Sequence, residues 1–162
     1  MSVTTGNAGE HLVMAELLAR GFDAYWADRG NTAYDVGCFA KETGRATRLR
    51  VKTTKKGEAI WNMKKTGELF LEQKETDDFV VICDIRNGIR GADMYVVPTP
   101  VVAQDLTQDH AFYLRFPTKN GKERTNSDMR VIRFYGEPKP ENQAFGYQDK
   151  YAQYRDAWNL LK

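Results

Sequence analysis

Apolar residues at helical spacing predict that the chain begins with a helix over residues 7–20. The apolar stripe of this helix contains Leu12, Ala15, Leu18 and Ala19. Asn7 is a suitable N-cap, Glu10 follows three positions later as in a capping box, and Gly21 suits the end of a helix. The pattern therefore favours one amphipathic helix at the start of the chain.

Shorter apolar runs after this helix predict strands. The predicted strands are residues 22–27, 34–40, 47–53, 79–85 and 93–99. The second and third alternate around a short polar turn, which is typical of a hairpin. The fourth, FVVICDI, is continuously apolar, as expected for a strand buried on both faces that pairs with the fifth.

The remaining segments have weaker patterns. Residues 54–65 are basic and loop-like, Pro100 is expected to open a short helix ending at Leu106, and residues 111–147 show no clear period. Residues 148–161 are predicted to form a final helix, whose packing stripe contains Tyr147, Tyr151, Tyr154 and Trp158. This order of elements predicts an α+β or α/β fold, with a central mixed sheet flanked by helices, in a single domain over 1–162.

Composition changes this picture mainly through the distribution of charge. The net charge of the 162 residues is only +2, but residues 41–65 hold nine Lys/Arg and two acids. Residues 66–110 hold nine acids and three bases. A basic surface on a nearly neutral chain points mildly to a phosphate-rich partner.

The cysteine content, the first ten residues and the length of the apolar runs exclude other classes of protein. Two Cys without a CxxC motif, and two His, do not favour a zinc site. The first ten residues lack the basic and apolar regions of a signal peptide, and no apolar run approaches the length of a membrane span. We therefore expect a cytoplasmic protein that is not inserted in a membrane.

The strand at 47–53 contains the candidate functional side chains. Its alternation puts Arg48, Arg50 and Lys52 on one face of the sheet, which is either simply solvated or meets a polyanion. Asp35 lies on the strand expected to pair with it, and Glu10 lies on the first helix. A carboxylate beside a lysine provides the parts for Mg²⁺-assisted cleavage of a phosphodiester, because carboxylate oxygens bind the cation and Lys stabilises developing charge.

Several short motifs in this order resemble the PD-(D/E)XK nuclease superfamily, especially its small Holliday-junction-resolvase-like and restriction-endonuclease-like members. The motifs are Gly9-Glu10, Ala15-Glu16-Leu17, Gly21-Phe22, Asn31-Thr32, Asp35-Val36 and Val51-Lys52-Thr53. The resemblance covers roughly residues 6–106 and returns at 151–161. It implies a restriction-endonuclease-like core and a metal-dependent nuclease that acts on DNA.

The resemblance also implies roles for individual residues. Asp35 matches the metal-binding Asp of the family, Lys52 matches its catalytic Lys, and Glu10 matches a helix acid that supports the metal. The metal would be Mg²⁺, with Mn²⁺ as a substitute, and family members often act as homodimers.

Residues flanking this predicted site are expected to contact the nucleic acid. Arg48, Lys55 and Lys56 would contact phosphates, and Trp61 either stacks on a base or fills a corner of the core.

Arg50 departs from the family pattern, which has Glu, Asp or Gln two residues before the Lys. A guanidinium cannot ligate Mg²⁺. Glu10 could complete the metal site, Arg50 could bind a phosphate, or the site could be inactive. The alternative function is thus a catalytically silent nucleic-acid-binding or regulatory protein with Arg50 in place of a metal ligand. A third is a protein-binding module that uses the acidic 66–110 half.

Overall fold

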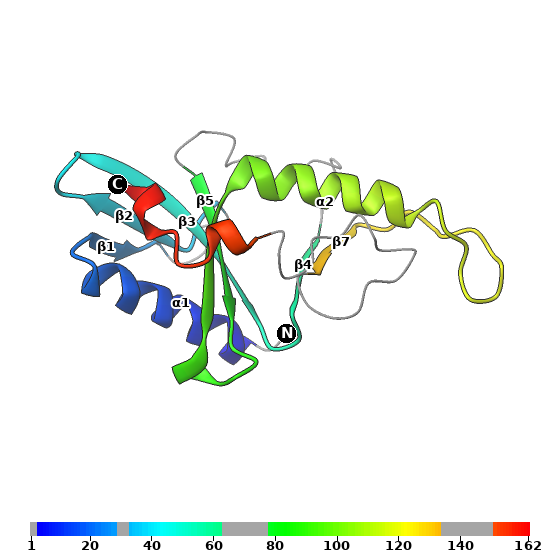
Figure 1. The fold of residues 1–162 in the computed structure, drawn as a ribbon, viewed down its shortest axis with the longest axis horizontal. Helices are drawn as coiled ribbons and strands as arrows, with labels where there is room; N and C mark the ends of the chain where they lie inside the picture. Colours follow the sequence, from blue (N-terminus) through cyan, green and yellow to red (C-terminus); the bar gives the residue numbers. More distant parts are fainter. Residues whose placement is uncertain (1–2, 29–32, 63–77, 134–150) are drawn as a thin grey trace.

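The centre of the fold is a mixed sheet of five strands in the order β1-β2-β3-β5-β6 (Figure 1). The structure is a computed structural model that describes residues 3–28, 33–62, 78–133 and 151–162. The strands are β1 (Asp23–Trp26), β2 (Val36–Ala40), β3 (Arg45–Thr54), β5 (Asp78–Asp84) and β6 (Asp93–Pro98). β3 and β5 are parallel, and the other neighbours are antiparallel. The predicted mixed sheet and the β2–β3 hairpin are confirmed.

Helices α1 (Val3–Ala19) and α2 (Thr99–Tyr113) cover opposite faces of this sheet. Every residue of β5 is buried, as predicted, and successive residues of a strand point to opposite faces. Val81 packs in a hydrophobic cluster with Val13 and Leu17 of α1. Its neighbour Ile82 packs in a second cluster with residues of α2. β5 therefore forms the centre of two cores, one on each side of the sheet.

The helix boundaries differ from the sequence prediction. α1 begins at Val3, so Asn7 and Glu10 lie inside the helix and do not form a capping box. An N-cap contributes only about 1 kcal/mol, and packing of the first turns of α1 against β3 overrides it. α2 has Pro100 in its first turn, as predicted, but extends beyond Leu106. In the described ranges, no helix is long and apolar enough to cross a membrane.

A second sheet was missed by the sequence prediction. β4 (Glu58–Asn62) pairs antiparallel with β7 (Met129–Arg133) in a two-stranded sheet. The prediction of a loop over residues 54–65 was therefore wrong in part, as was the irregular reading of 111–147. These strands are short and far apart in sequence, so no local signal marks their pairing. Trp61 and Ile132 from this sheet are buried in the cluster under α2.

The end of the chain forms two short 3-10 turns, which contradicts the predicted helix over 148–161. They are η3 (Ala152–Tyr154) and η4 (Trp158–Leu161); a third, η1 (Ile89–Gly91), lies between β5 and β6. Residues 148–150 and Tyr147 lie outside the described part. Asp156 has a φ of 51°, and its N–H donates to the Met94 carbonyl at 2.8 Å. This bond to β6 cannot form in a continuous helix.

A very close approach joins α1 to β3. A Cβ atom on Gly9 would lie 1.9 Å from Thr53 Oγ1, so only glycine fits at this point. Thr53 Oγ1 also donates a hydrogen bond to the Gly6 carbonyl at 3.3 Å. Both glycines lie in α1, and Thr53 lies on the buried side of β3. This contact sets the position of α1 on the sheet, and with it that of Glu10.

An ion pair between a half-exposed arginine and a buried aspartate joins β3 to β5. Arg48 Nε and Nη2 donate to the two oxygens of Asp78 at 2.6 and 2.9 Å. Asp78 is 0% exposed, whereas the Arg48 side chain is 37% exposed. These residues are partners in the parallel register. A two-point bond from arginine satisfies a carboxylate that would otherwise be costly to bury.

The Gly9 contact predicts opposite effects of the same substitution at two positions in α1. Gly9→Ala should destabilise the protein by about 1–3 kcal/mol, because the new methyl group overlaps Thr53. Gly6→Ala should stabilise it by up to about 1 kcal/mol, since a Cβ there meets nothing within 4 Å. Urea unfolding followed by circular dichroism measures both. Equal effects of the two substitutions would contradict the packing role of Gly9.

The Arg48–Asp78 pair predicts strong coupling between the two residues. Arg48→Met should cost about 3–5 kcal/mol of unfolding free energy, because it leaves a buried carboxylate without its guanidinium partner. The double variant Arg48→Met/Asp78→Leu should recover most of that loss. Lys56→Met, at an exposed position, is the control and should change stability by no more than about 0.5 kcal/mol. Additive effects in urea unfolding would refute the coupling.

Candidate functional site

Asp35 is held at the point where β2 begins beside β3. Its N–H donates to the Leu49 carbonyl at 2.9 Å, and its own carbonyl accepts from the Ala27 N–H at 3.0 Å. Its Oδ2 accepts the Val51 N–H at 2.7 Å. Within the described residues, Oδ1 makes no hydrogen bond. The backbone thus fixes the Asp35 carboxylate and leaves one oxygen available to a ligand.

Glu10, on α1, lies near enough to this aspartate for the two charges to interact. Partial burial raises the pKa of Glu10, and the negative charge of Asp35 raises it further, against a smaller opposing effect of His11. Two carboxylates close enough to repel each other favour a cation between them. Since Glu10 is not part of a helix cap, its position in mid-helix is better explained by this arrangement.

Lys52 lies on the same side of β3 as Arg50, in a confined environment. Burial lowers the pKa of Lys52, and the positive charge of Arg50 lowers it further, whereas Asp35 opposes both effects. The Lys52 ammonium lies over the Trp61 ring, 5.1 Å from its centroid. This cation–π contact fixes the direction of the side chain. Asp35 is therefore electrostatically coupled to both Glu10 and Lys52.

Trp61 itself is only 4% exposed. In this position its indole cannot stack on a base, so the base-stacking expectation for Trp61 is corrected. Sequence reasoning missed its contact with Lys52, because the strand β4 that carries Trp61 was read as a loop. Its role in the structure is to fill the core and support Lys52.

Arg50 is anchored to the backbone before Asp35. Its Nη2 donates to the Ala33 carbonyl at 2.9 Å, two residues before Asp35. Arg50 therefore holds the chain segment that leads into Asp35, as well as carrying charge toward the site. This contact could not be read from the sequence, because the strand alternation gives only the face of Arg50 and not its partner.

The other predicted phosphate contacts fall into two groups. Arg48 is engaged by Asp78, so its main role is in the fold. Lys55 and Lys56 are exposed in the turn after β3. These two lysines are accessible to a polyanion near the end of β3.

Glu10 and Asp35 fit a hard divalent cation in the nature of their donors, because both provide carboxylate oxygens. A third ligand would have to come from another group. In the part of the chain that the structure describes, no cluster of three His, Cys, Asp or Glu side chains could hold a metal. Arg50 occupies the strand position where such a carboxylate is expected.

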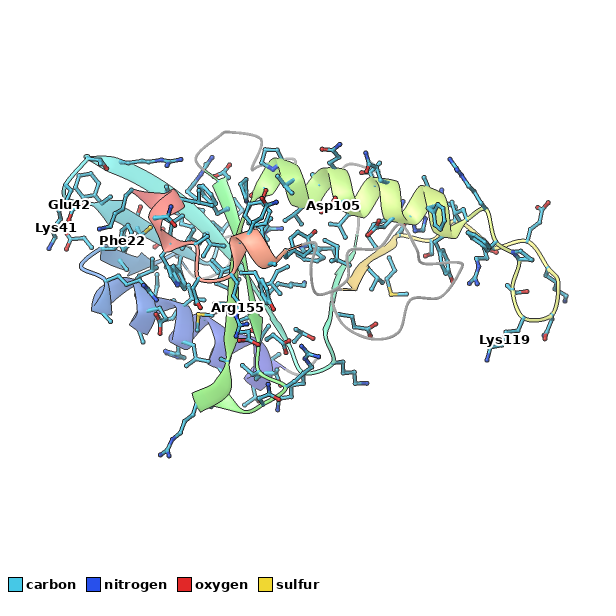
Figure 2. The ribbon with its side chains drawn as sticks, viewed as in Figure 1. Phe22, Lys41, Glu42, Asp105, Lys119 and Arg155 are labelled. Carbon is cyan, nitrogen blue, oxygen red and sulfur yellow. The ribbon has the colours of Figure 1, made fainter. Side chains whose placement is uncertain are left out.

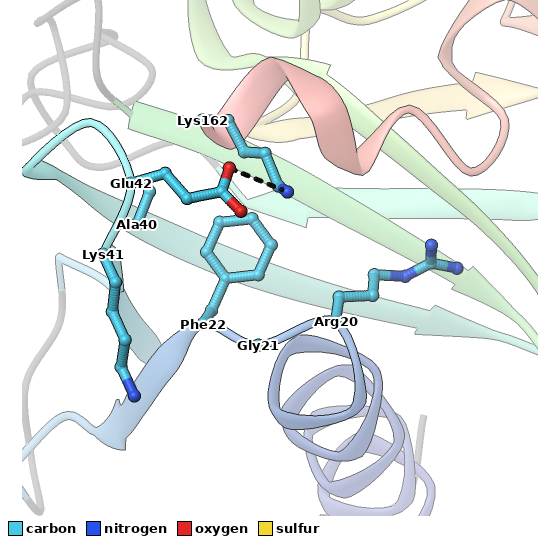
Figure 3. A pocket seen from close by; sticks show the side chains of 7 residues that line it. All are labelled: Arg20, Gly21, Phe22, Ala40, Lys41, Glu42 and Lys162. Atoms are coloured by element: carbon cyan, nitrogen blue, oxygen red, sulfur yellow. Dashed lines mark hydrogen bonds and ion pairs between the residues drawn. The ribbon is translucent and has the colours of Figure 1, made fainter.

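A surface pocket of about 160 Å³ lies elsewhere, at the opposite end of β2 from Asp35. Its lining residues are Arg20, Gly21, Phe22, Ala40, Lys41, Glu42 and Lys162 (Figure 3). Figure 2 shows Phe22, Lys41 and Glu42 together at one end of the molecule, far from Lys119 at the other. Lys162 and Glu42 form an ion pair at 3.3 Å, and Lys41 pairs with Asp23 at 2.7 Å. The pocket is therefore separate from the Asp35 site.

Comparison with known proteins supports the fold. No protein-family model and no curated protein matches this chain. Among solved structures, the chain is similar to the bacterial homing endonuclease I-Ssp6803I, with a TM-score of 0.51 and 15% identity over 99% of this chain and 91% of that one. It is also similar to the Holliday junction resolvase Hjc of Archaeoglobus fulgidus, with a TM-score of 0.48 and 18% identity over 79% of this chain and 83% of that one. The likeness to the homing endonuclease confirms the predicted restriction-endonuclease-like α+β fold.

Proposed function

We propose that this chain is a metal-dependent nuclease that hydrolyses phosphodiester bonds in DNA. The observation that carries the proposal is the Asp35 carboxylate, which the Val51 N–H holds at 2.7 Å on the strand next to β3, where its charge interacts with those of Glu10 and Lys52. Two carboxylates and a partly buried lysine on a nuclease-like fold are the groups that this chemistry requires. The fold alone does not carry the proposal, because one fold hosts many functions.

In this proposal each residue has a distinct role. Asp35 and Glu10 hold a Mg²⁺ or Mn²⁺ ion, which when bound stabilises negative charge that develops on the phosphate. Lys52, whose charge interacts with that of Asp35 and whose pKa is lowered, exchanges a proton with an attacking water more readily than an exposed lysine. The contact with Trp61 holds the Lys52 ammonium in a fixed direction. Lys55 and Lys56 attract the backbone of the DNA.

The second candidate is a catalytically silent nucleic-acid-binding protein on the same scaffold. It is favoured by Arg50, whose positive charge stands where a metal ligand is expected and repels a divalent ion. In that case Asp35 and Glu10 would balance the charge of Arg50 and Lys52 without a metal.

A cleavage assay tests the first candidate. Plasmid, linear duplex, four-way junction and single-stranded DNA are incubated with the wild type in Mg²⁺ and in Mn²⁺. Asp35→Asn, which keeps an acceptor for the Val51 N–H, and Lys52→Met should each lower the cleavage rate by about 100-fold or more. Lys119→Ala, at an exposed position far from the site, should cut like the wild type.

The outcomes of this assay separate the two candidates. Cleavage should also decline on acidification at a higher pH than for an ordinary glutamate, because the raised pKa of Glu10 lets protons compete with the metal earlier. Folded wild type that cuts none of these substrates in either metal would eliminate the nuclease and leave the silent protein.

The charge of Arg50 predicts an order of metal affinities. Arg50→Glu should strengthen Mn²⁺ binding by about tenfold or more, because it replaces a repelling cation with a ligand. Arg50→Gln removes the charge without adding a carboxylate, so its affinity should lie between those of Arg50→Glu and the wild type. Isothermal titration calorimetry measures all three, and circular dichroism checks the fold. Identical affinities would mean that Arg50 does not face the metal.

A further inference from the structure

Two exposed aromatic side chains lie on the sheet face that carries the β3 cations. Tyr25 of β1 is paired with Gly37 of β2, which is paired with Arg48 of β3. Paired residues share a face of the sheet, and so do residues two apart on one strand. The side away from α1 therefore carries Tyr25, Arg48 and Phe39, which is two residues after Gly37. We call this side of the three strands the outer face of β1–β3. In the described part of the chain, α2 packs mainly on β5, β6 and β7, and β4 covers the outer face near Lys52.

The aromatic rings on this outer face are accessible to solvent. Tyr25 is 50% exposed and Phe39 is 38% exposed. A Cβ on Gly37 would lie 2.3 Å from Tyr25 Cζ and 2.6 Å from its hydroxyl oxygen, so the phenol ring rests directly on the Gly37 backbone. One side of the ring is thus supported, and the other is presented outward. A fixed aromatic ring of this kind is a suitable platform for a planar ligand.

The same outer face leads to the candidate site. Arg50 and Lys52 follow Arg48 at intervals of two residues, so all three share the face. Lys52 lies about 13 Å along β3 from Arg48, at 3.3 Å per residue. Lys55 and Lys56 are exposed just beyond the end of the strand. A row of cations that begins beside an aromatic platform and ends at Lys52 suits one nucleic-acid strand, whose bases stack on the platform while its phosphates follow the row.

We propose that the outer face of β1–β3 binds an unpaired stretch of DNA, with bases stacked on Tyr25 and Phe39 and phosphates along Arg50, Lys52, Lys55 and Lys56. The proposal rests on the proposed function and names its substrate: DNA with unpaired nucleotides beside the cleaved bond. Bases within a duplex are stacked on each other and cannot reach the rings, whereas unpaired bases can. A second copy of the chain is a poorer occupant, because a two-fold contact would bring like-charged rows together.

Binding without metal tests this proposal separately from catalysis. A fluorescent single-stranded oligonucleotide and a blunt duplex of the same length are titrated with the protein in EDTA at one fixed salt concentration, and anisotropy gives the Kd. Wild type should bind the single strand more tightly. Tyr25→Leu and Phe39→Leu should each weaken single-strand binding by about 5- to 150-fold, the range expected for one lost stack, and leave duplex binding unchanged.

One further variant tests the support of the Tyr25 ring, and two act as controls. Tyr25→Phe keeps the ring and should bind like the wild type. Gly37→Ala should weaken single-strand binding, because its methyl group displaces the Tyr25 ring. Trp26→Leu removes an exposed aromatic whose ring packs against His11 of α1, on the other face, and should have no effect. Circular dichroism checks that each variant is folded.

Each result supports or overturns the proposal. Equal weakening of single-strand and duplex binding, or no effect of either leucine variant, would overturn it. The proposal would also be overturned if sedimentation showed that Tyr25→Leu loses self-association while its DNA binding is unchanged. The outer face would then be a contact between two copies of the chain. If the leucine variants selectively lose single-strand binding and the wild type cuts no substrate, the result would support this face while refuting the nuclease.

Discussion

The contact between Gly9 and Thr53 is the constraint on which the rest of this arrangement depends. With no Cβ on Gly9, α1 approaches β3 closely enough for Thr53 Oγ1 to bond the Gly6 carbonyl at 3.3 Å. This approach closes the first hydrophobic core and brings Glu10, the next residue of α1, to Asp35. Two short motifs far apart in sequence, Gly9-Glu10 and Val51-Lys52-Thr53, therefore meet in the fold, where Gly9 packs against Thr53.

The cations of β3 look alike in sequence but have different partners. Arg48 neutralises the buried Asp78 and holds two parallel strands together. Arg50 binds the Ala33 carbonyl and so supports the segment that leads to Asp35. Lys52, with its lowered pKa and its contact with Trp61, is the member of the row best suited to proton transfer. One alternating pattern thus serves the fold, the positioning of Asp35 and the proposed chemistry in turn along the strand.

How much of this could be predicted from the sequence depended on whether the signal was local. The alternation of β3 and the apolar run of β5 gave the correct strands, because both patterns can be recognised within a few consecutive residues. The pairing of β4 with β7, and the Asp156 turn that replaces a final helix, depend on partners far away in the chain. The same limit applied at the site, where Asp35 and Lys52 could be chosen by pattern but the burial of Trp61 could not.

The outer face of β1–β3 requires a glycine at position 37, which the proposed catalytic residues alone do not explain. Gly37 lies on the same strand as the buried Val36 and Cys38, where a larger apolar residue would ordinarily favour a strand. A side chain there would displace the Tyr25 ring, since its Cβ would fall 2.3 Å from Cζ. Glycine at this position lowers strand propensity and retains the aromatic platform. The face therefore gains a ring fixed against the sheet, next to the strand that carries the proposed catalytic lysine.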